Sequence, residues 1–190
     1  MARIPYPEPD ELSDRVNEAL ERVPPLNVFR ILSHAQTAFR PYLRFGGALL
    51  ADLELGPVPR ELAILQTARV FEAEYEWIQH VAIGRAVGVT DAQIAALERG
   101  DLDDESFEPS ERALLHFTTA AMQQPRPSDE DFAAVREHFS PREIVELLLV
   151  AGAYAMLARI MTSLDLDLDE ALGEDVLRSA TRGGGGAAPG

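Results

Sequence analysis

Three side chains able to exchange protons recur at a helical spacing in the middle of the chain. Glu72, Glu76 and His80 stand at i, i+4 and i+8, so they share one face if a single helix carries all three. Glu61 lies on what the sequence predicts to be the preceding helix. If the two helices pack antiparallel, the Glu61 carboxylate comes near the His80 imidazole. A carboxylate beside an imidazole orients the ring and favours its protonated form, as in a general acid/base pair.

The same spacing has two other interpretations. A Glu–His pair at i and i+4 is common on the exposed surface of a helix. Together with Glu61, the three residues also resemble the ligands of a metal site in a helical bundle. However, the sequence has no HExxH or Glu-x-x-His pair, and the other histidines, His34, His116 and His138, are scattered. We therefore expect no metal ion.

Side chains around this motif could bind a substrate. Tyr75 lies beside the predicted acid/base face and can donate a hydrogen bond, while Trp77 lies on another face of the same helix. Trp77 is either a wall of a pocket or a helix–helix packing residue. Arg69, Arg85 and Arg159 are the candidates for binding a carboxylate with two hydrogen bonds.

Two residue types are missing, and each absence excludes a class of chemistry. The sequence contains no cysteine, which excludes disulfides, thiolate nucleophiles and thiolate metal sites. All 17 basic residues are arginine, and the absence of lysine excludes a Schiff base on a side chain. The net charge of −15 disfavours nucleic acid and anionic membranes as partners. The polar, proline-rich residues 1–10 contain no apolar targeting segment, so the expected location is the cytoplasm.

Helix signals recur along most of the chain and strand signals are nearly absent, which predicts an all-α fold. The clearest boundaries are Gly88 after residues 74–87, the Thr90/Gln93 capping box before a helix ending near Arg99, and Ser140-Pro141 before a helix ending near Leu164. The other expected helices cover about residues 10–23, 28–34 (capped by Asn27), 37–53, 59–71, 110–123, 128–138 and 165–178.

These residues also carry a resemblance to a known family. The phrase Tyr75-Glu76-Trp77 followed by His80, downstream of Arg60-Glu61-Leu62, resembles the signature of the carboxymuconolactone decarboxylase / alkylhydroperoxidase D-like family. The later helix that begins Pro141-Arg142-Glu143 is similar as well. The resemblance implies an all-α, cofactor-free multi-helix bundle around a two-helix Glu…His motif. It also implies a homo-oligomer, a trimer or hexamer, in which subunits pack their motif helices together.

The resemblance divides the chain into four parts. Residues 1–26 are an N-terminal segment with the first helix, and residues 27–172 are the family-like helical domain. Residues 173–182 are a C-terminal tail. Residues 183–190 are rich in glycine, alanine and proline, and we expect them to be disordered.

The alkylhydroperoxidase branch of the family uses two cysteines three residues apart, served by a glutamate and two histidines. Carried over to this sequence, the glutamate is Glu61, the cysteine positions hold Ala73 and Glu76, the intervening histidine is Tyr75, and the downstream histidine is His80. Both thiols are therefore missing. Peroxide reduction by thiol–disulfide exchange is excluded for this chain.

The decarboxylase branch needs neither a thiol pair nor a metal. The resemblance thus implies an acid/base enzyme, a lyase acting on a small organic acid or lactone by decarboxylation or a related proton transfer. His80 would be the acid/base, Glu61 and Glu76 its partners, and Tyr75 a donor in the pocket. The alternative is a non-catalytic or binding protein in which these residues form a structural network at a subunit interface. A solvent-open pocket beside His80 would favour the enzyme.

Overall fold

The computed structural model describes residues 1–51 and 53–173. Over these residues the chain has nine α-helices, one short 3-10 helix, and no strand, which confirms the all-α class. The elements in chain order are η1 (Pro9–Glu11), α1 (Asp14–Leu20), α2 (Asn27–Leu32), α3 (Gln36–Ala51), α4 (Pro57–Val70), α5 (Glu74–Val87), α6 (Asp91–Arg99), α7 (Pro109–Gln123), α8 (Asp129–His138) and α9 (Pro141–Leu164).

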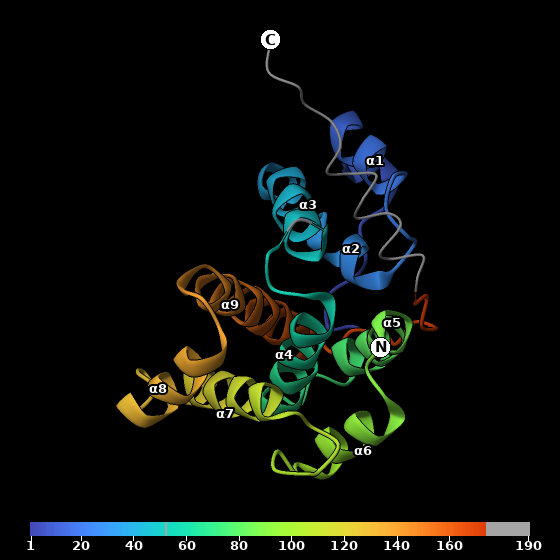
Figure 1. Ribbon diagram of the computed structural model, residues 1–190. Helices are drawn as coiled ribbons and strands as arrows, with labels where there is room; N and C mark the ends of the chain where they lie inside the picture. Colours follow the sequence, from blue (N-terminus) through green and yellow to red (C-terminus); the bar gives the residue numbers. More distant parts are fainter. Residues whose placement is uncertain (52, 174–190) are drawn as a thin grey trace.

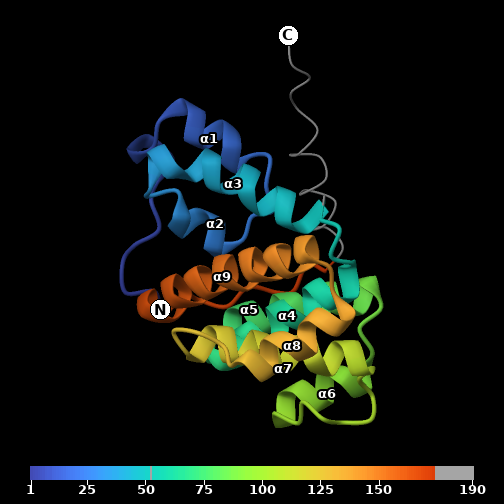
Figure 2. The same ribbon diagram turned by 60° about the vertical axis from the view of Figure 1, so that its left-hand side comes forward.

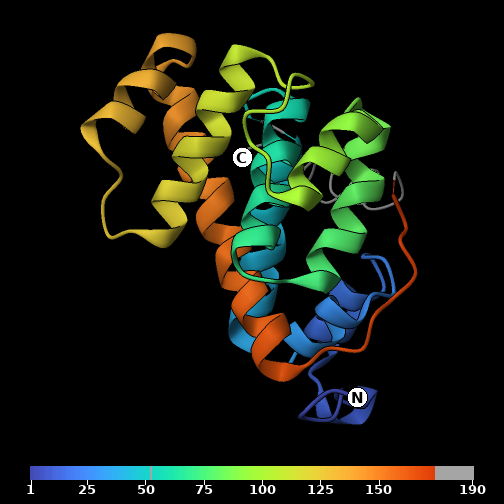
Figure 3. The same ribbon diagram turned by 90° about the horizontal axis from the view of Figure 1, so that it is seen from below.

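Helix α4 is the centre of the fold. It packs against α5, α7 and α9, and all of its residues from Arg60 to Ala68 are buried. Figure 3 shows α4 between α9 and α5. Helices α1, α2 and α3 lie on one side of α9, and α4 to α8 lie on the other (Figures 1 and 2). The chain thus forms a bundle around α4 with three N-terminal helices over its α9 side.

The helix boundaries follow local chemistry. The Thr90 side chain accepts a hydrogen bond from the Gln93 amide at 3.2 Å, and the Ser140 hydroxyl accepts one from the Glu143 amide at 3.2 Å. Gly88 ends α5 with φ at 112°, in the left-handed region that a glycine adopts without strain. The predicted boundaries of α5, α6 and α9 are therefore confirmed.

The N-terminal prediction of one helix over residues 10–23 is wrong. The chain forms η1 and then α1, separated by an extended Leu12-Ser13 pair. The Ser13 amide donates to the Gln36 side chain at 2.9 Å, so a long-range partner replaces the helical one. Likewise Asn27 is the first residue of α2, and Leu26 occupies the cap position.

The chain does not form the predicted helix after α9 over the residues described there. Asp165 ends α9 in the left-handed conformation, and residues 165–172 then run as an irregular segment, which we call the C-terminal strap. The remainder of that predicted helix, the predicted tail after Gly173 and the Gly-rich end lie outside the described residues.

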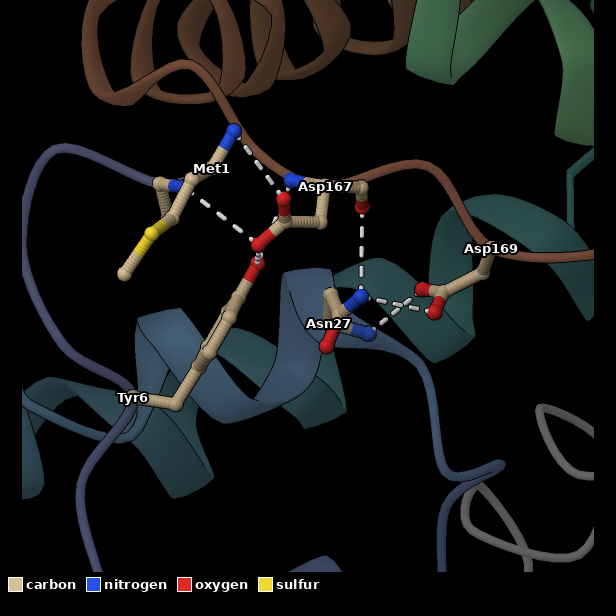
Figure 4. A network of polar contacts seen from close by, with 6 residues as sticks. Met1, Tyr6, Asn27, Asp167 and Asp169 are labelled. Carbon is tan, nitrogen blue, oxygen red and sulfur yellow. Dashed lines mark hydrogen bonds and ion pairs between the residues drawn. The ribbon is translucent and has the colours of Figure 1, made fainter.

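The strap connects distant parts of the chain through two aspartates (Figure 4). Asp167 pairs with the N-terminal amine of Met1 at 3.2 Å. Asp169 accepts hydrogen bonds from the Asn27 amide at 2.6 Å and the Asn27 side chain at 2.8 Å. It also accepts one from the Tyr75 hydroxyl. The strap therefore holds the start of α2 against α5.

Helix α9 is the only helix among the described residues that is long and apolar enough to cross a membrane by length and composition. Half of its most apolar window is buried within this chain, where it packs on α4 and α7. The apolar sequence of α9 is therefore accounted for largely by its place in the core.

We expect Asp169→Ala to lower the free energy of unfolding by about 2–3 kcal/mol, because three donors lose a charged acceptor. Urea unfolding measures this. The control is Glu170→Ala, an exposed change at the next residue, which should stay within about 0.5 kcal/mol of wild type. Equal effects of the two variants would contradict the role of Asp169.

Candidate functional site

The site is built on a fully buried carboxylate. Glu61 lies in the first half of α4 with no exposed surface, and each of its oxygens has a donor. Oε2 is 2.7 Å from Nδ1 of His80, and Oε1 accepts from Nε of Arg60 at 3.0 Å. A buried carboxylate is costly unless it is paired and hydrogen-bonded. Glu61 meets this requirement through both neighbours.

Arg60 extends this pairing to the N-terminal helices. Its Nη1 donates to the Leu50 carbonyl in the last turn of α3 at 2.6 Å, and the side chain is buried. A guanidinium holds several donors in one fixed plane. Arg60 therefore links the end of α3 to the Glu61 carboxylate on α4.

One ring nitrogen of His80, Nδ1, forms a hydrogen bond with Glu61, and the other, Nε2, is available to a ligand. Because Glu61 accepts from Nδ1–H, the neutral ring carries its lone pair on Nε2. Nε2 has no hydrogen-bond partner among the described residues. The ring also packs edge-on against Tyr154 of α9, with centroids 4.8 Å apart and planes at 86°. Glu61 and Tyr154 together fix the direction in which Nε2 can accept or deliver a proton.

A cavity of about 1220 Å³ opens beside His80. Its polar inner surface, which we call the acid/base floor, consists of Tyr42, Glu76, His80 and Tyr154. Apolar side chains from α2, α3, α5 and α9 form much of the remaining wall, including Val28, Phe29, Leu50, Ile83, Leu157 and Met161. The cavity thus lies between the N-terminal helices and the α5/α9 side of the bundle.

Glu76 is a buried carboxyl group without a partner. It follows the same face of α5 as His80, and only 2% of its surface is exposed. Neither of its oxygens hydrogen-bonds to any residue that the structure describes. Burial raises the pKa of the Glu76 carboxyl well above its usual range. The group therefore keeps its proton to higher pH than an exposed glutamate does, and in the protonated form it can donate a hydrogen bond.

Tyr42 and Tyr154 complete the floor, and the sequence analysis did not identify either. Burial raises the pKa of both hydroxyls, so they remain protonated donors near neutral pH. Neither hydroxyl has a hydrogen-bond partner within residues 1–51 and 53–173. A tyrosine inside the apolar run of α9 was a usable signal for Tyr154, because a buried hydroxyl needs a partner. Nothing in the local sequence distinguishes Tyr42.

The structure gives Glu76 and Tyr75 roles other than those expected from the sequence. Glu61, and not Glu76, holds the His80 ring. Tyr75 borders the cavity, but its hydroxyl donates to Asp169 and accepts from the Val28 amide at 3.3 Å. The Tyr75 hydroxyl thus donates its hydrogen bond to the strap and not to the cavity. Tyr75 therefore positions the strap and α2.

The predicted substrate-binding residues do not line this cavity. Trp77 is half-buried between helices, with the Arg69 guanidinium 5.6 Å from its ring centroid. Arg69, Arg85 and Arg159 are exposed and have partners elsewhere. These partners are the Glu98 carbonyl for Arg69, the Asp91 carboxylate for Arg85 and the ring of Phe71 for Arg159.

The predicted row of Glu72, Glu76 and His80 on one helix face includes only its last two members in the structure. Glu72 is exposed and has φ at 53°, in the turn before α5 begins. It therefore leaves the face shared by Glu76 and His80. In the part of the chain that the structure describes, no three histidine or acidic residues gather as a metal site would require.

Comparison with known proteins identifies the same family as the sequence motifs. The model of the carboxymuconolactone decarboxylase family matches residues 36–120, which include Glu61, Glu76 and His80. This match and the fold confirm the resemblance to the carboxymuconolactone decarboxylase / AhpD-like family. No curated protein matches the chain at a significant level.

Three solved structures share the fold. An alkylhydroperoxidase AhpD core, an uncharacterized peroxidase-related protein from Ralstonia eutropha JMP134, is 24% identical with a TM-score of 0.75, covering 94% of this chain and 96% of that one. An uncharacterized peroxidase-related protein from Silicibacter sp. TM1040 is 16% identical with a TM-score of 0.69, covering 88% and 92%. A protein of unknown function from Agrobacterium tumefaciens is 20% identical with a TM-score of 0.67, covering 73% and 95%. At these identities the likeness establishes the fold alone.

The raised pKa of Glu76 predicts a pH-dependent effect of Glu76→Gln. The folded protein keeps the Glu76 proton above pH 4.5, the ordinary pKa of the group, whereas the unfolded chain loses it there. Wild-type stability from this group is therefore fully present below that pH and is lost as pH rises toward the folded pKa. Glu76→Gln should gain stability relative to wild type by up to about 1.4 kcal/mol per pH unit over this window.

Urea unfolding at pH 4.5, 6 and 8 measures the difference. Glu74→Gln removes an exposed carboxylate from the same turn of α5 and is the matched control. A gap between Glu76→Gln and wild type that does not change with pH would show that Glu76 is not held neutral.

Proposed function

We propose that the chain, which resembles the carboxymuconolactone decarboxylase / AhpD-like family in sequence and fold, is a cofactor-free acid/base enzyme acting on an organic acid or lactone. One observation carries the proposal. His80, oriented by the buried Glu61 carboxylate at 2.7 Å, borders an open cavity together with three groups that can donate hydrogen bonds. A purely structural network would instead satisfy its own polar groups.

The acid/base floor provides a base that can take a proton from carbon and donors that can stabilise the resulting enolate oxygen. Nε2 of neutral His80 accepts a proton from a carbon next to a carbonyl, and Glu61 stabilises the imidazolium that forms. The electron pair left on the substrate moves to the carbonyl oxygen as an enolate. Tyr42, Tyr154 and protonated Glu76 are the donors available to that oxygen. The imidazolium then delivers the proton to a different carbon of a conjugated enolate, which completes an isomerisation, or to the original carbon, which gives proton exchange.

Decarboxylation uses the same groups in a different order. The carbon–carboxylate bond breaks, carbon dioxide leaves, and its electron pair remains as an enolate held by the floor donors. Imidazolium His80 protonates the carbon and is recharged from water. Both routes need a proton carrier and neutral oxygen donors in one cavity, and neither needs a thiol. The absence of cysteine from the sequence excludes a thiol-dependent peroxidase reaction for this chain.

His80→Gln and Glu61→Gln should each slow the reaction by about 10²-fold or more, because the first removes the proton carrier and the second its orienting partner. The protein is incubated in D₂O with a panel of carboxylic acids and lactones, and proton NMR follows deuterium incorporation and product formation. This readout detects proton transfer at carbon even without net turnover.

His116→Gln is the matched control, because His116 also pairs with a carboxylate, Asp103, at 2.9 Å but on the exposed surface. It should react at the wild-type rate. Rates for His80→Gln and Glu61→Gln equal to that of His116→Gln, or no exchange with any panel member, would contradict the proposed function.

The exposed surface of α9 supports a proposal that the chain forms a homo-oligomer. Val145, Leu148, Leu149 and Met156 are each at least 40% exposed, and their spacing places them along one side of the helix. Contiguous exposed apolar surface of this kind is typical of an interface between proteins. We propose that this stripe contacts further copies of the chain.

Leu149→Asp should reduce the oligomer toward the 20.8 kDa monomer, because it would bury a charge at the contact. Light scattering coupled to gel filtration measures the mass. Phe132→Asp, at a similarly exposed apolar position on α8, is the control and should leave the mass unchanged. A wild-type mass near that of one chain at micromolar concentration would refute the oligomer.

A further inference from the structure

The cavity beside His80 is larger than a small acid needs, and its outer part has a distinct chemistry. Its volume of about 1220 Å³ exceeds the range of roughly 300–1,000 Å³ typical of sites for drug-sized ligands. The acid/base floor accounts for only part of its lining. What the remaining surface can hold therefore bears on the class of substrate.

Four exposed arginines border the cavity on its N-terminal side, and we call them the arginine mouth: Arg15, Arg22, Arg40 and Arg44. Arg15 lies on α1 and Arg22 lies in the turn that follows α1, whereas Arg40 and Arg44 are four residues apart on α3 and share one face of that helix. The two helices contact each other and run side by side above α9 (Figures 1 and 2). All four guanidinium groups thus lie around one opening.

The four arginines of the mouth lack the partners that most other arginines of the described residues have. Arg60, Arg85, Arg99, Arg126 and Arg142 form ion pairs with carboxylates, and Arg3, Arg69 and Arg112 donate to backbone carbonyls. Among the described residues, none of the four guanidinium groups of the arginine mouth forms an ion pair or a hydrogen bond. In a chain of net charge −15, four unpaired cations around one cavity favour an anionic ligand.

The other charges at the opening limit the charge of that ligand. Glu18 and Glu21 also border the cavity, so four positive charges face two negative ones. The net excess of two positive charges favours an anionic head group and is half of what four unopposed arginines would provide. Between the mouth and the floor the wall is largely apolar, with Leu26, Val28, Phe29 and Leu50 among its residues. An apolar ligand segment would be buried there.

We propose that the cavity binds an amphipathic monocarboxylate. Its carboxylate is held by the arginine mouth, its apolar body lies along the wall, and its other end reaches the acid/base floor. The inference rests on the proposed function for the reaction at the floor and adds the class of substrate. The arginine mouth then supplies binding energy remote from the reacting bond, which positions that bond at His80.

Binding of octanoate, butyrate and octanol, measured by calorimetry at low ionic strength, tests this proposal. Octanoate should bind more tightly than butyrate by about fourfold for each added methylene group, because the apolar wall buries the chain. Octanol has the same chain without the charge and should bind at least about tenfold more weakly than octanoate. No binding of octanoate, or octanoate binding equal to that of butyrate or of octanol, would overturn the proposal.

Matched variants locate the head group. The double variant Arg40→Gln/Arg44→Gln should weaken octanoate about 10- to 100-fold and leave octanol unchanged, because only the carboxylate loses its donors. Arg136→Gln, an exposed arginine on α8 that does not border the cavity, should bind all probes as wild type does. Equal octanoate affinity in the double variant and Arg136→Gln would overturn the assignment of the mouth.

Glu61→Gln separates this proposal from the proposed function. It should bind octanoate with wild-type affinity, because Glu61 does not line the cavity. Tight octanoate binding without proton exchange on any tested acid would contradict the proposed reaction while supporting the ligand class. Proton exchange on short acids without binding of octanoate would do the reverse.

Discussion

The burial of the Glu61 carboxylate is the constraint on which the site depends. A charged group with no exposed surface must find donors inside the protein, and here it has two of opposite kinds. Arg60 provides a permanent charge and also binds the Leu50 carbonyl of α3. His80 provides a titratable ring from α5. One carboxylate therefore connects α3, α4 and α5, and the same contacts that stabilise its charge fix the orientation of His80.

Glu76 shows the opposite solution to the same problem. It is nearly as buried as Glu61, yet no donor among the described residues meets it, so burial raises the pKa of its carboxyl and favours the neutral form. Glu76 thus borders the cavity as an unpaired carboxyl group, whereas Glu61 is a paired carboxylate that reaches the cavity only through His80. Two carboxyl groups in such different surroundings can serve one site as acid and as base. The difference follows from the donors each position meets.

The sequence predicted what depends on local spacing. Capping boxes and a terminal glycine located α5, α6 and α9, and the positions of Glu61 and His80 on consecutive helices predicted that they could meet. It could not predict contacts between distant segments. Asp169 of the strap accepts a hydrogen bond from Asn27, 142 positions away, and it also accepts the hydrogen bond of the Tyr75 hydroxyl. Tyr42 reaches the acid/base floor only because α3 crosses α9. The arginines chosen near the motif in sequence lie on faces of α4, α5 and α9 that turn away from the cavity.

The division of the cavity between segments also separates chemistry from recognition. The family match covers residues 36–120, which contain His80, Glu61, Glu76 and Tyr42 of the site. Arg15 and Arg22 of the mouth and Tyr154 of the floor lie outside it. The likeness to the family therefore bears on the Glu61–His80 pair and says little about the ligand. Because α1 contributes to the opening but not to the floor, changes in α1 can alter which acid enters while leaving the Glu61–His80 pair intact. Substrate choice in this fold is then set where the helices cover the cavity, far along the chain from the residues that react.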